Sequence, residues 1–210
     1  MALTRSVLVF VAWVAFAAFL ELGVIVDRFG EPALALAFDR AVVNHGTLVA
    51  WEVTQLGRAY VLVPLAVALL IAAWPLQAWR GRILFSLVML LLCWRNADLF
   101  QHLFARPRRL DWFILHETSH SYPSSHAAIA AGFYALWAWL IARSELARPT
   151  RLIVAGILGL VAIAICWSRL ALGAHYMTDI AGGLLLGLAL VVAGTAVWPG
   201  IAREAGKERA

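Results

Sequence analysis

Apolar residues fill six long runs of the sequence, and short polar stretches separate them. A helix needs about 20 apolar residues to cross the hydrocarbon core of a bilayer, and the runs are roughly of this length. They are Val7–Val26, Tyr60–Trp79, Ile83–Phe100, Ala127–Ala142, Leu152–Trp167 and Ile180–Trp198. The pattern predicts an all-α integral membrane protein built as a bundle of six transmembrane helices.

The interval between the first two runs, Asp27–Arg58, mixes charged with apolar residues. Apolar positions such as Phe38, Val42 and Val53 allow an amphipathic extramembrane helix that lies on the membrane surface. A helix packed within a loop is an equally good interpretation. Because no repeat, low-complexity segment or linker divides the chain, we expect residues 1–210 to form one membrane-embedded domain.

The composition supports the membrane class. Of the 210 residues, 63% are hydrophobic and 14% are charged, whereas soluble domains are about 45–50% apolar and about 25% charged. The net charge of +5 comes from arginine, because Lys207 is the one lysine. No basic patch with interleaved aromatic residues resembles a nucleic-acid surface. We therefore expect the lipid bilayer, and not nucleic acid, as a partner.

Six spans place both termini on one side of the membrane. That side holds nine of the 17 lysine and arginine residues, and the opposite side holds eight. Four of those eight, Arg106, Arg108, Arg109 and Arg169, belong to polar clusters that carry chemistry. With these four set aside, the positive-inside rule predicts cytoplasmic termini and polar clusters on the outer side.

The stretch Ser168–Asp179, with the sequence SRLALGAHYMTD, joins the last two runs. Titratable groups at the edge of hydrocarbon are costly, so their presence indicates function. His175 and Asp179 would share one face of a helix, where the carboxylate orients one imidazole nitrogen and the other faces the site. Arg169 adds a forked cation suited to phosphate. Together they indicate a nucleophile that attacks an anion.

Two further polar clusters lie between the third and fourth runs, on the same side of the membrane. They are Gln101–Arg109, with the sequence QHLFARPRR, and Tyr122–His126, with the sequence YPSSH. Ser124 suits the N-cap of the fourth span. His126 would then lie in the first turn, where free backbone N–H groups favour an anion.

These clusters resemble the motifs of the type 2 phosphatidic acid phosphatase family, which are membrane lipid phosphatases. The family's third motif, Ser-Arg-x5-His-x3-Asp, is matched in full by Ser168, Arg169, His175 and Asp179. Its second motif, Pro-Ser-Gly-His, is matched except that Ser125 replaces glycine. Three such motifs in order on one face carry the resemblance.

The first motif of the family, Lys-x6-Arg-Pro, is degraded in this chain. If Arg108 is the family arginine, Gln101 stands at the lysine position and Arg109 at the proline position. If Arg106 is used instead, Leu99 stands at the lysine position. We prefer the first alignment because ARPRR parallels the Arg-Pro-Arg-Pro run that is frequent in the family.

The resemblance implies phosphoryl transfer with no metal or cofactor. His175 would attack phosphorus and form a phosphohistidine, Asp179 would orient it, and His126 would act as general acid and then as general base. The implied phosphate-binding residues are Arg108, Arg169, Ser124, Ser125, Gln101 and Ser168, with Arg106, Arg109 and His102 as further candidates. Such chemistry rests on positioning and charge stabilisation. A metal held by the two histidines and Asp179 is less favoured, because arginines repel a cation and suit an oxyanion.

We therefore predict a lipid phosphatase that acts on a phosphomonoester or diphosphate of a membrane lipid, with undecaprenyl diphosphate as the first candidate substrate. The alternatives are a phosphatase of glycerolipid or lipid A phosphates, a lipid-to-lipid phosphotransferase, and a weakened lipid-binding or transport protein. The last is kept open by Gln101 in place of lysine. We expect a bacterial cytoplasmic (inner) membrane location with the site on the periplasmic side. The oligomeric state is left open.

Overall fold

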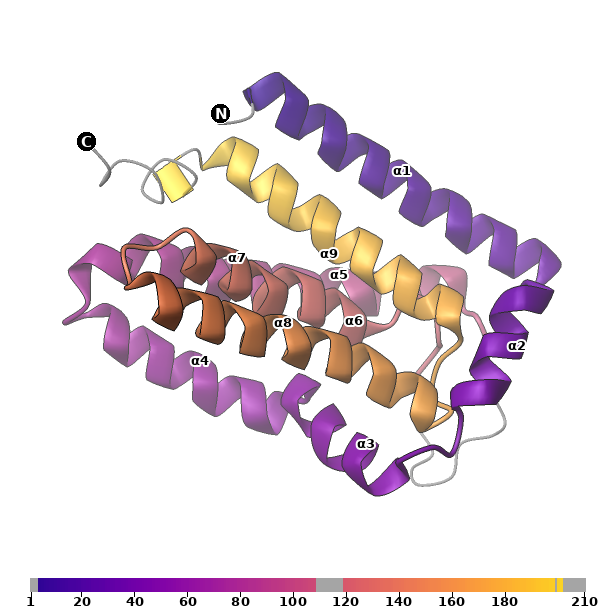
Figure 1. Ribbon diagram of the computed structural model, residues 1–210. Coiled ribbons are helices and arrows are strands. Elements are labelled where there is room, and N and C mark those ends of the chain that lie inside the picture. The colour runs from indigo at the N-terminus through magenta and orange to yellow at the C-terminus, as the bar shows by residue number, and fades with distance from the viewer. Residues whose placement is uncertain (1–3, 109–118, 199, 202–210) are drawn as a thin grey trace.

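The computed structural model describes residues 4–108, 119–198 and 200–201, and the regular structure of this part of the chain is helical (Figure 1). In chain order the elements are α1 (Arg5–Phe29), α2 (Ala33–Val42), α3 (Thr47–Thr54), η1 (Gln55–Gly57), α4 (Ala59–Ala73), η2 (Gln77–Trp79), α5 (Arg80–Phe104), α6 (Ser125–Ile129), η3 (Ala130–Ala135), α7 (Leu136–Ala142), α8 (Arg148–Ala171) and α9 (Met177–Val197). The predicted all-α class is confirmed.

Within the described residues, five helices are long and apolar enough to cross a membrane. Four of them contain α1, α5, α8 and α9, and the fifth is the continuous helix Ser125–Ala142 formed by α6, η3 and α7. A sixth span is reached when the segment Thr47–Gly57 and α4, which meet at a bend of 44°, are counted together. The structure thus agrees with the predicted six-span bundle.

The second span differs from the prediction. We expected one helix over Tyr60–Trp79, but α4 ends at Ala73 and is only 15 residues long. Pro75 follows closely, and because proline has no N–H it cannot donate the next helical hydrogen bond, to the Ile71 carbonyl. That carbonyl accepts from the Trp74 N–H instead, at 3.2 Å. The helix reaches the length of a span only when it is counted together with the segment Thr47–Gly57 across the bend.

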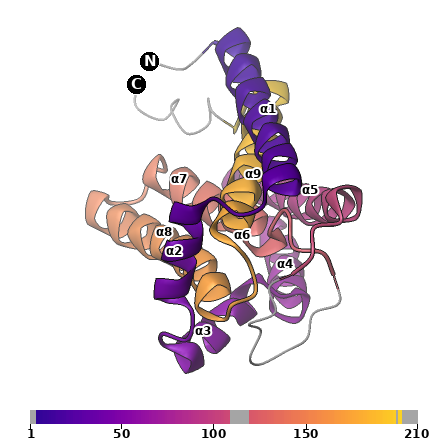
Figure 2. The ribbon, with the colours of Figure 1, turned by 90° about the vertical axis from the view of Figure 1, so that its right-hand side faces the viewer.

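The interval between the first two spans, for which we predicted one helix, forms two: α2 contains Phe38 and Val42, whereas Val53 lies in α3. Helix α2 lies across one end of the bundle (Figures 1 and 2) and packs against α8 and α9. The preceding span, α1, packs chiefly along α9. The side chains that α1 buries recur every three or four residues, as expected for one helix face. They are Ala12, Ala15, Phe19, Gly23 and Val26.

An aromatic cluster ties α1 to the segment that leads into α6. The rings of Phe19 and Tyr122 are stacked with their centroids 5.6 Å apart, and Phe104 meets Tyr122 edge-on at 5.1 Å. The Tyr122 hydroxyl donates a hydrogen bond of 2.5 Å to the Phe19 carbonyl. Burial raises the pKa of the Tyr122 phenol, which keeps the group protonated as a donor. This cluster fixes the chain just ahead of Ser124.

Glycines let α9 approach α6 closely. A Cβ atom at Gly183 would lie 2.4 Å from the Ser124 carbonyl oxygen, and one at Gly187 would lie 2.6 Å from the Ala128 carbonyl oxygen. Small residues at such positions allow two membrane helices to pack backbone against backbone. These glycines therefore set how closely the two helices pack.

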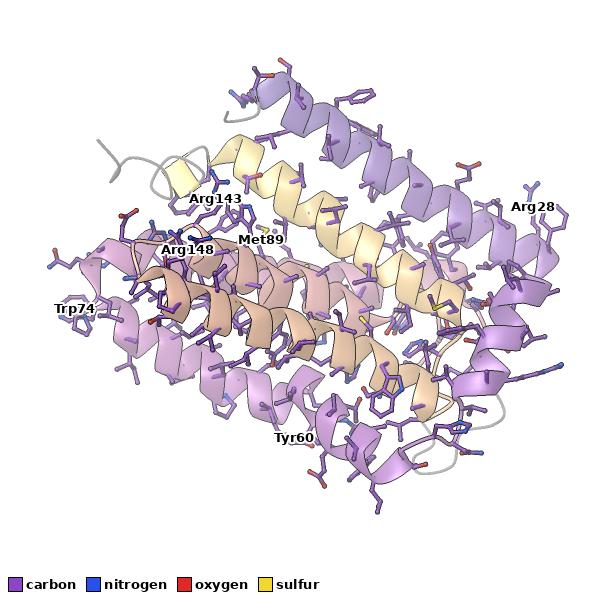
Figure 3. The ribbon with its side chains drawn as sticks, viewed as in Figure 1. Arg28, Tyr60, Trp74, Met89, Arg143 and Arg148 are labelled. Atoms are coloured by element: carbon purple, nitrogen blue, oxygen red, sulfur yellow. The ribbon has the colours of Figure 1, made fainter. Side chains whose placement is uncertain are left out.

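The polar clusters all lie at one end of the bundle. The end of α5, the start of α6, the end of α8 and the start of α9 meet there, beside α2 (Figures 1 and 2). Arg143 and Arg148, which flank the connection between α7 and α8, lie at the opposite end (Figure 3). The fold therefore brings together residues from widely separated parts of the chain.

The contact of α9 with α6 gives a stability prediction. We expect Gly183→Ala to lower the thermal unfolding midpoint in detergent, because the new methyl group meets a backbone oxygen that cannot rotate away. Overpacking of this kind costs about 1–3 kcal/mol. Gly156→Ala is the matched control, since no described atom lies within 4 Å of a Cβ there. Equal midpoints for the two variants would contradict the packing argument.

Candidate active site

The turn between α8 and α9 sets the spacing of the third motif. Helix α8 ends in a Schellman motif, in which the N–H of Ala174 donates to the Arg169 carbonyl and that of Gly173 to the Leu170 carbonyl, each at 2.9 Å. Gly173 has a φ of +67°, which glycine adopts without steric cost. The turn therefore carries the chain from Arg169, in the last turn of α8, directly to His175.

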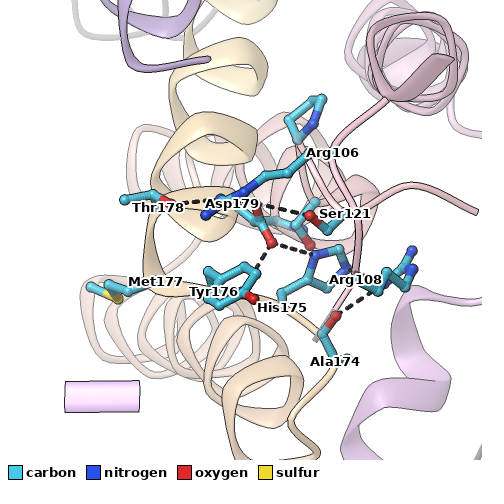
Figure 4. Close-up of polar contacts among 12 residues, drawn as sticks. Arg106, Arg108, Ser121, Ala174, His175, Tyr176, Met177, Thr178 and Asp179 are labelled. Carbon is cyan, nitrogen blue, oxygen red and sulfur yellow. Dashed lines mark hydrogen bonds and ion pairs between the residues drawn. The ribbon is translucent and has the colours of Figure 1, made fainter. Parts of the chain in front are cut away.

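His175 and Asp179 face each other at the start of α9, as Figure 4 shows. His175 Nδ1 lies 3.3 Å from Asp179 Oδ2, and the same oxygen accepts a 2.9 Å hydrogen bond from the Tyr176 N–H. We expected the pair on one helix face, but His175 lies two residues before Met177, the first residue of α9. The turn into α9, and not a shared helix face, brings the His175 ring to the Asp179 carboxylate. With Nδ1–H directed at Asp179, Nε2 carries the imidazole lone pair.

Arg108 lies in front of that lone pair. Its Nη1 is 3.1 Å from His175 Nε2 and donates to the Ala174 carbonyl at 3.1 Å. Ser119 holds the other side of the guanidinium, since its carbonyl accepts from Nε and its hydroxyl from Nη2, both at 2.7 Å. Of the two alignments of the first motif, the one that uses Arg108 thus places a guanidinium beside His175.

Arg106 is directed away from His175 and toward two carboxylates. Its Nη1 donates to Asp179 Oδ1 at 2.6 Å, and its Nη2 donates to Glu31 Oε2 at 2.9 Å. The guanidinium also lies 4.3 Å from the centroid of the Tyr176 ring. Burial alone would lower the pKa of Arg106, but the charges of Asp179 and Glu31 outweigh it and raise this pKa. A phosphate contact of Arg106 stays a prediction.

His126 lies in the first turn of α6, as predicted, and is buried. Its ring packs against Gly57, where an added Cβ would lie 2.3 Å from His126 Cδ2. The Thr54 carbonyl accepts a hydrogen bond from the ring, whereas no described group bonds to Nε2. Arg169, His175 and Arg58 all lie within electrostatic range of His126.

Arg169 is fully buried beside these groups. Its Nη1 donates a 2.8 Å hydrogen bond to the Thr54 hydroxyl. Thr54 therefore holds Arg169 through its side chain and His126 through its carbonyl. Thr54 was not among the predicted site residues, because no local pattern distinguishes it from any polar residue near the end of a helix.

The segment before α6 is held from two sides. Ser124 is the N-cap of α6, as predicted, and its hydroxyl accepts from the Ala127 N–H at 3.4 Å. The Ser124 N–H donates to the Asp179 carbonyl at 3.0 Å. Gln101 is buried, and its amide donates to the Pro123 carbonyl at 2.8 Å. Gln101 thus lies where it fixes the loop beside the site.

The remaining candidates are placed differently. Ser125 is the first residue of α6. Ser168 is buried and donates to the Ile165 carbonyl within α8 at 2.7 Å. His102 is exposed and bonds to a carbonyl of its own helix, so it stands apart from the other residues. Arg109 lies outside the described residues. The phosphate contacts of these residues stay predictions.

Three carboxylates cap the start of α9. Asp179 accepts from Tyr176 as described, the Met177 N–H donates to Asp39 Oδ1 at 3.0 Å, and the Thr178 N–H donates to Glu31 Oε1 at 3.2 Å. Negative groups at a helix N-terminus are stabilising. Asp39 and Glu31 come from the interval between the first two spans. Neither was among the predicted site residues, because their partners lie more than 130 residues further along the chain.

Taken together, the helical membrane bundle and the buried histidine–aspartate pair beside two arginines define a membrane protein with a phosphate-directed site. Residues 59–202 match the PAP2 superfamily. The chain belongs to this superfamily of membrane lipid phosphatases, and the resemblance seen in its motifs is confirmed.

Two relatives illustrate the similarity. The chain is 37% identical over 78 residues to phosphatidylglycerophosphatase B of Bacillus subtilis (strain 168), a match that covers 37% of this chain and only 38% of that protein. It is 30% identical over 143 residues to the putative undecaprenyl-diphosphatase YbjG of Escherichia coli (strain K12), which covers 65% of this chain and 67% of that protein.

Solved structures show the same fold. A transmembrane PAP2 type phosphatidylglycerolphosphate phosphatase from Bacillus subtilis superposes with a TM-score of 0.73 at 24% identity, over 90% of this chain and 96% of that one. LpxE of Aquifex aeolicus superposes with a TM-score of 0.55 at 24% identity, over 79% of this chain and 97% of that one. At these identities the likeness concerns the fold alone.

The contacts of Thr54 give a prediction. We expect Thr54→Val to lower kcat/KM about 10–100-fold, because a hydrogen bond to a buried charged group is worth about 1.5–3 kcal/mol. The measurement is phosphate release from a lipid phosphate substrate in detergent. Thr195→Val is the control, since Thr195 is also buried but bonds only within α9, to the Val192 carbonyl. Wild-type kcat/KM in Thr54→Val would refute the role of this contact.

Proposed function

We propose that this protein is a metal-independent lipid phosphatase that works through a phosphohistidine on His175. The observation that carries the proposal is the orientation of His175. Its Nδ1 is held by the buried Asp179, and its Nε2 faces Arg108. A carboxylate behind the ring stabilises the positive charge that the imidazole gains when Nε2 bonds to phosphorus.

In the proposed first step, Nε2 of His175 attacks phosphorus and the bond from phosphorus to the leaving oxygen breaks. His126 donates a proton to that oxygen, and Arg108 and Arg169 stabilise the equatorial oxygens. The N–H groups of the first turn of α6 are further donors, because they have no partner within the helix. General acid help from a histidine is worth roughly 10²–10⁴-fold.

In the proposed second step, His126 accepts a proton from water and the resulting hydroxide attacks phosphorus. The bond between phosphorus and Nε2 of His175 breaks, and inorganic phosphate leaves. The placement of His126 supports this role, since its Nδ1 side is held by Thr54 and its buried Nε2 has no described partner. Arginines around the reacting phosphate suit an oxyanion and disfavour a metal cation.

As substrate we propose undecaprenyl diphosphate, which would yield undecaprenyl phosphate and inorganic phosphate. The similarity to YbjG, a putative undecaprenyl-diphosphatase, supports this choice. Phosphatidylglycerophosphate is the second candidate, which the similarity to phosphatidylglycerophosphatase B favours. Transfer of the phosphoryl group to a second lipid in place of water would use the same first step.

We also propose a location and a topology. The bacterial relatives and the membrane spans support the cytoplasmic membrane of a bacterium. The arginine distribution supports cytoplasmic termini, which would place the start of α9 and its site on the outer side. A lipid phosphate of the outer leaflet would then meet His175 at the membrane surface.

The proposal is tested by phosphate release from purified protein in detergent with excess chelator. Undecaprenyl diphosphate and phosphatidylglycerophosphate are offered separately, and we expect release from the first to be faster. His175→Ala should lower the rate by about 10³-fold or more, because it removes the nucleophile. His45→Ala, an exposed histidine in the connection between α2 and α3, is the control and should keep the rate. Loss of activity with chelator, or retained activity in His175→Ala, would exclude this mechanism.

A second prediction separates the two steps. With undecaprenyl diphosphate labelled in its terminal phosphate, we expect His126→Ala to accumulate labelled protein. A phosphate monoester is a weakly basic leaving group, so the first step depends less on the proton from His126 than hydrolysis of the phosphohistidine depends on His126 as the base. The label should be stable to alkali and labile to acid, and it should be absent from the double variant His126→Ala, His175→Ala. Equal label in both variants would place the phosphoryl group elsewhere.

A further inference from the structure

Glu31 is connected to the nucleophile through a continuous series of buried contacts. It lies in the connection between α1 and α2, outside residues 59–202 that match the superfamily. Its side chain is 4% exposed and its Oε2 lies 2.9 Å from Arg106 Nη2. Arg106 Nη1 in turn lies 2.6 Å from Asp179 Oδ1, and Asp179 Oδ2 lies 3.3 Å from His175 Nδ1. Figure 4 shows the part of this series from Arg106 to His175.

Glu31 is held in one orientation by α9. Its Oε1 accepts from the Thr178 N–H at 3.2 Å, and its Oε2 accepts from the Thr178 hydroxyl. The same hydroxyl accepts from Arg106 Nη1 at 2.9 Å. The carboxylate therefore cannot turn away from Arg106 without losing contacts to the start of α9.

Glu31, Arg106 and Asp179 together carry a net negative charge on the Asp179 side of the His175 ring. Glu31 and Asp179 carry one negative charge each and Arg106 carries one positive charge, so the three together are negative by one unit. Because all three are buried, solvent screens these charges little. Without Glu31, the guanidinium would be balanced by Asp179 alone, and less net negative charge would face the imidazole.

We infer that Glu31 is a positioning residue for the phosphoryl transfer. It holds Arg106 between two carboxylates, so that Asp179 keeps the orientation and the net charge that stabilise His175 as its ring becomes positively charged. The inference rests on the proposed function. Glu31 touches neither the substrate nor the reacting atoms, and its effect is expected on the chemical step and not on substrate binding.

The test compares Glu31→Gln and Glu31→Asp with the wild type and with Glu52→Gln, a change of an exposed glutamate on α3. Phosphate release from undecaprenyl diphosphate and from phosphatidylglycerophosphate gives kcat and KM, and thermal unfolding in detergent gives the midpoint. We expect Glu31→Gln to lower kcat about 10–100-fold and to leave KM within about twofold of the wild type. An effect of this size is known from metal sites when a residue that holds a ligating side chain in place is removed. Glu31→Asp keeps the charge and should recover most of kcat.

Arg106, the partner of Glu31, provides a second test that can be used if Glu31→Gln does not fold. Arg106→Lys keeps the positive charge but loses the fork that reaches two carboxylates, so it should also lower kcat with little change in KM. Wild-type kcat in folded Glu31→Gln or Arg106→Lys, or equal losses of kcat in Glu31→Asp and Glu31→Gln, would overturn the inference. Failure of the wild type to release phosphate from either lipid would instead overturn the proposed function.

Discussion

The buried carboxylate of Asp179 is the constraint on which the rest of the site depends. An uncompensated charge at a fully buried position costs several kcal/mol, and Asp179 is 0% exposed. The chain compensates with Arg106, with the Tyr176 N–H and with the ring of His175. Each compensating group is thereby fixed in space. His175 is thus oriented by the same contacts that make burial of the carboxylate tolerable.

The two helices that begin at the site use their N-termini in different ways. Helix α9 directs its first N–H groups at the protein's own carboxylates, of which Glu31 lies in the connection between α1 and α2 and Asp39 lies in α2 itself. Helix α6 is capped by the neutral Ser124, which adds no negative charge at its start. The first arrangement stabilises the turn that carries His175. The second leaves the positive end of the helix dipole without a carboxylate at its N-cap, Ser124, an arrangement that favours an anion.

The sequence was sufficient to predict what is encoded locally. Ser124 could be assigned as an N-cap because capping depends on neighbouring residues, and the apolar runs marked the spans because their length is set by the bilayer. The end of α4 before Pro75 was not predicted, because the residues on both sides of this proline are apolar and were read as one span. Glu31 and Thr54 could not be predicted at all. Their partners are brought to them only by tertiary packing, and the residues themselves belong to no motif.

The structure also gives a physical account of the missing lysine. Gln101 is buried and bonds to the Pro123 carbonyl, a contact that a neutral amide makes without burying a charge. The loop before α6 is therefore held in place whether or not a phosphate is bound. Positive charge near His126 comes from Arg169 and Arg58, which both lie within electrostatic range of its ring. The absence of the motif lysine is thus compatible with a working phosphate site. Gln101 supplies the contact that holds the loop, and the arginines supply the positive charge.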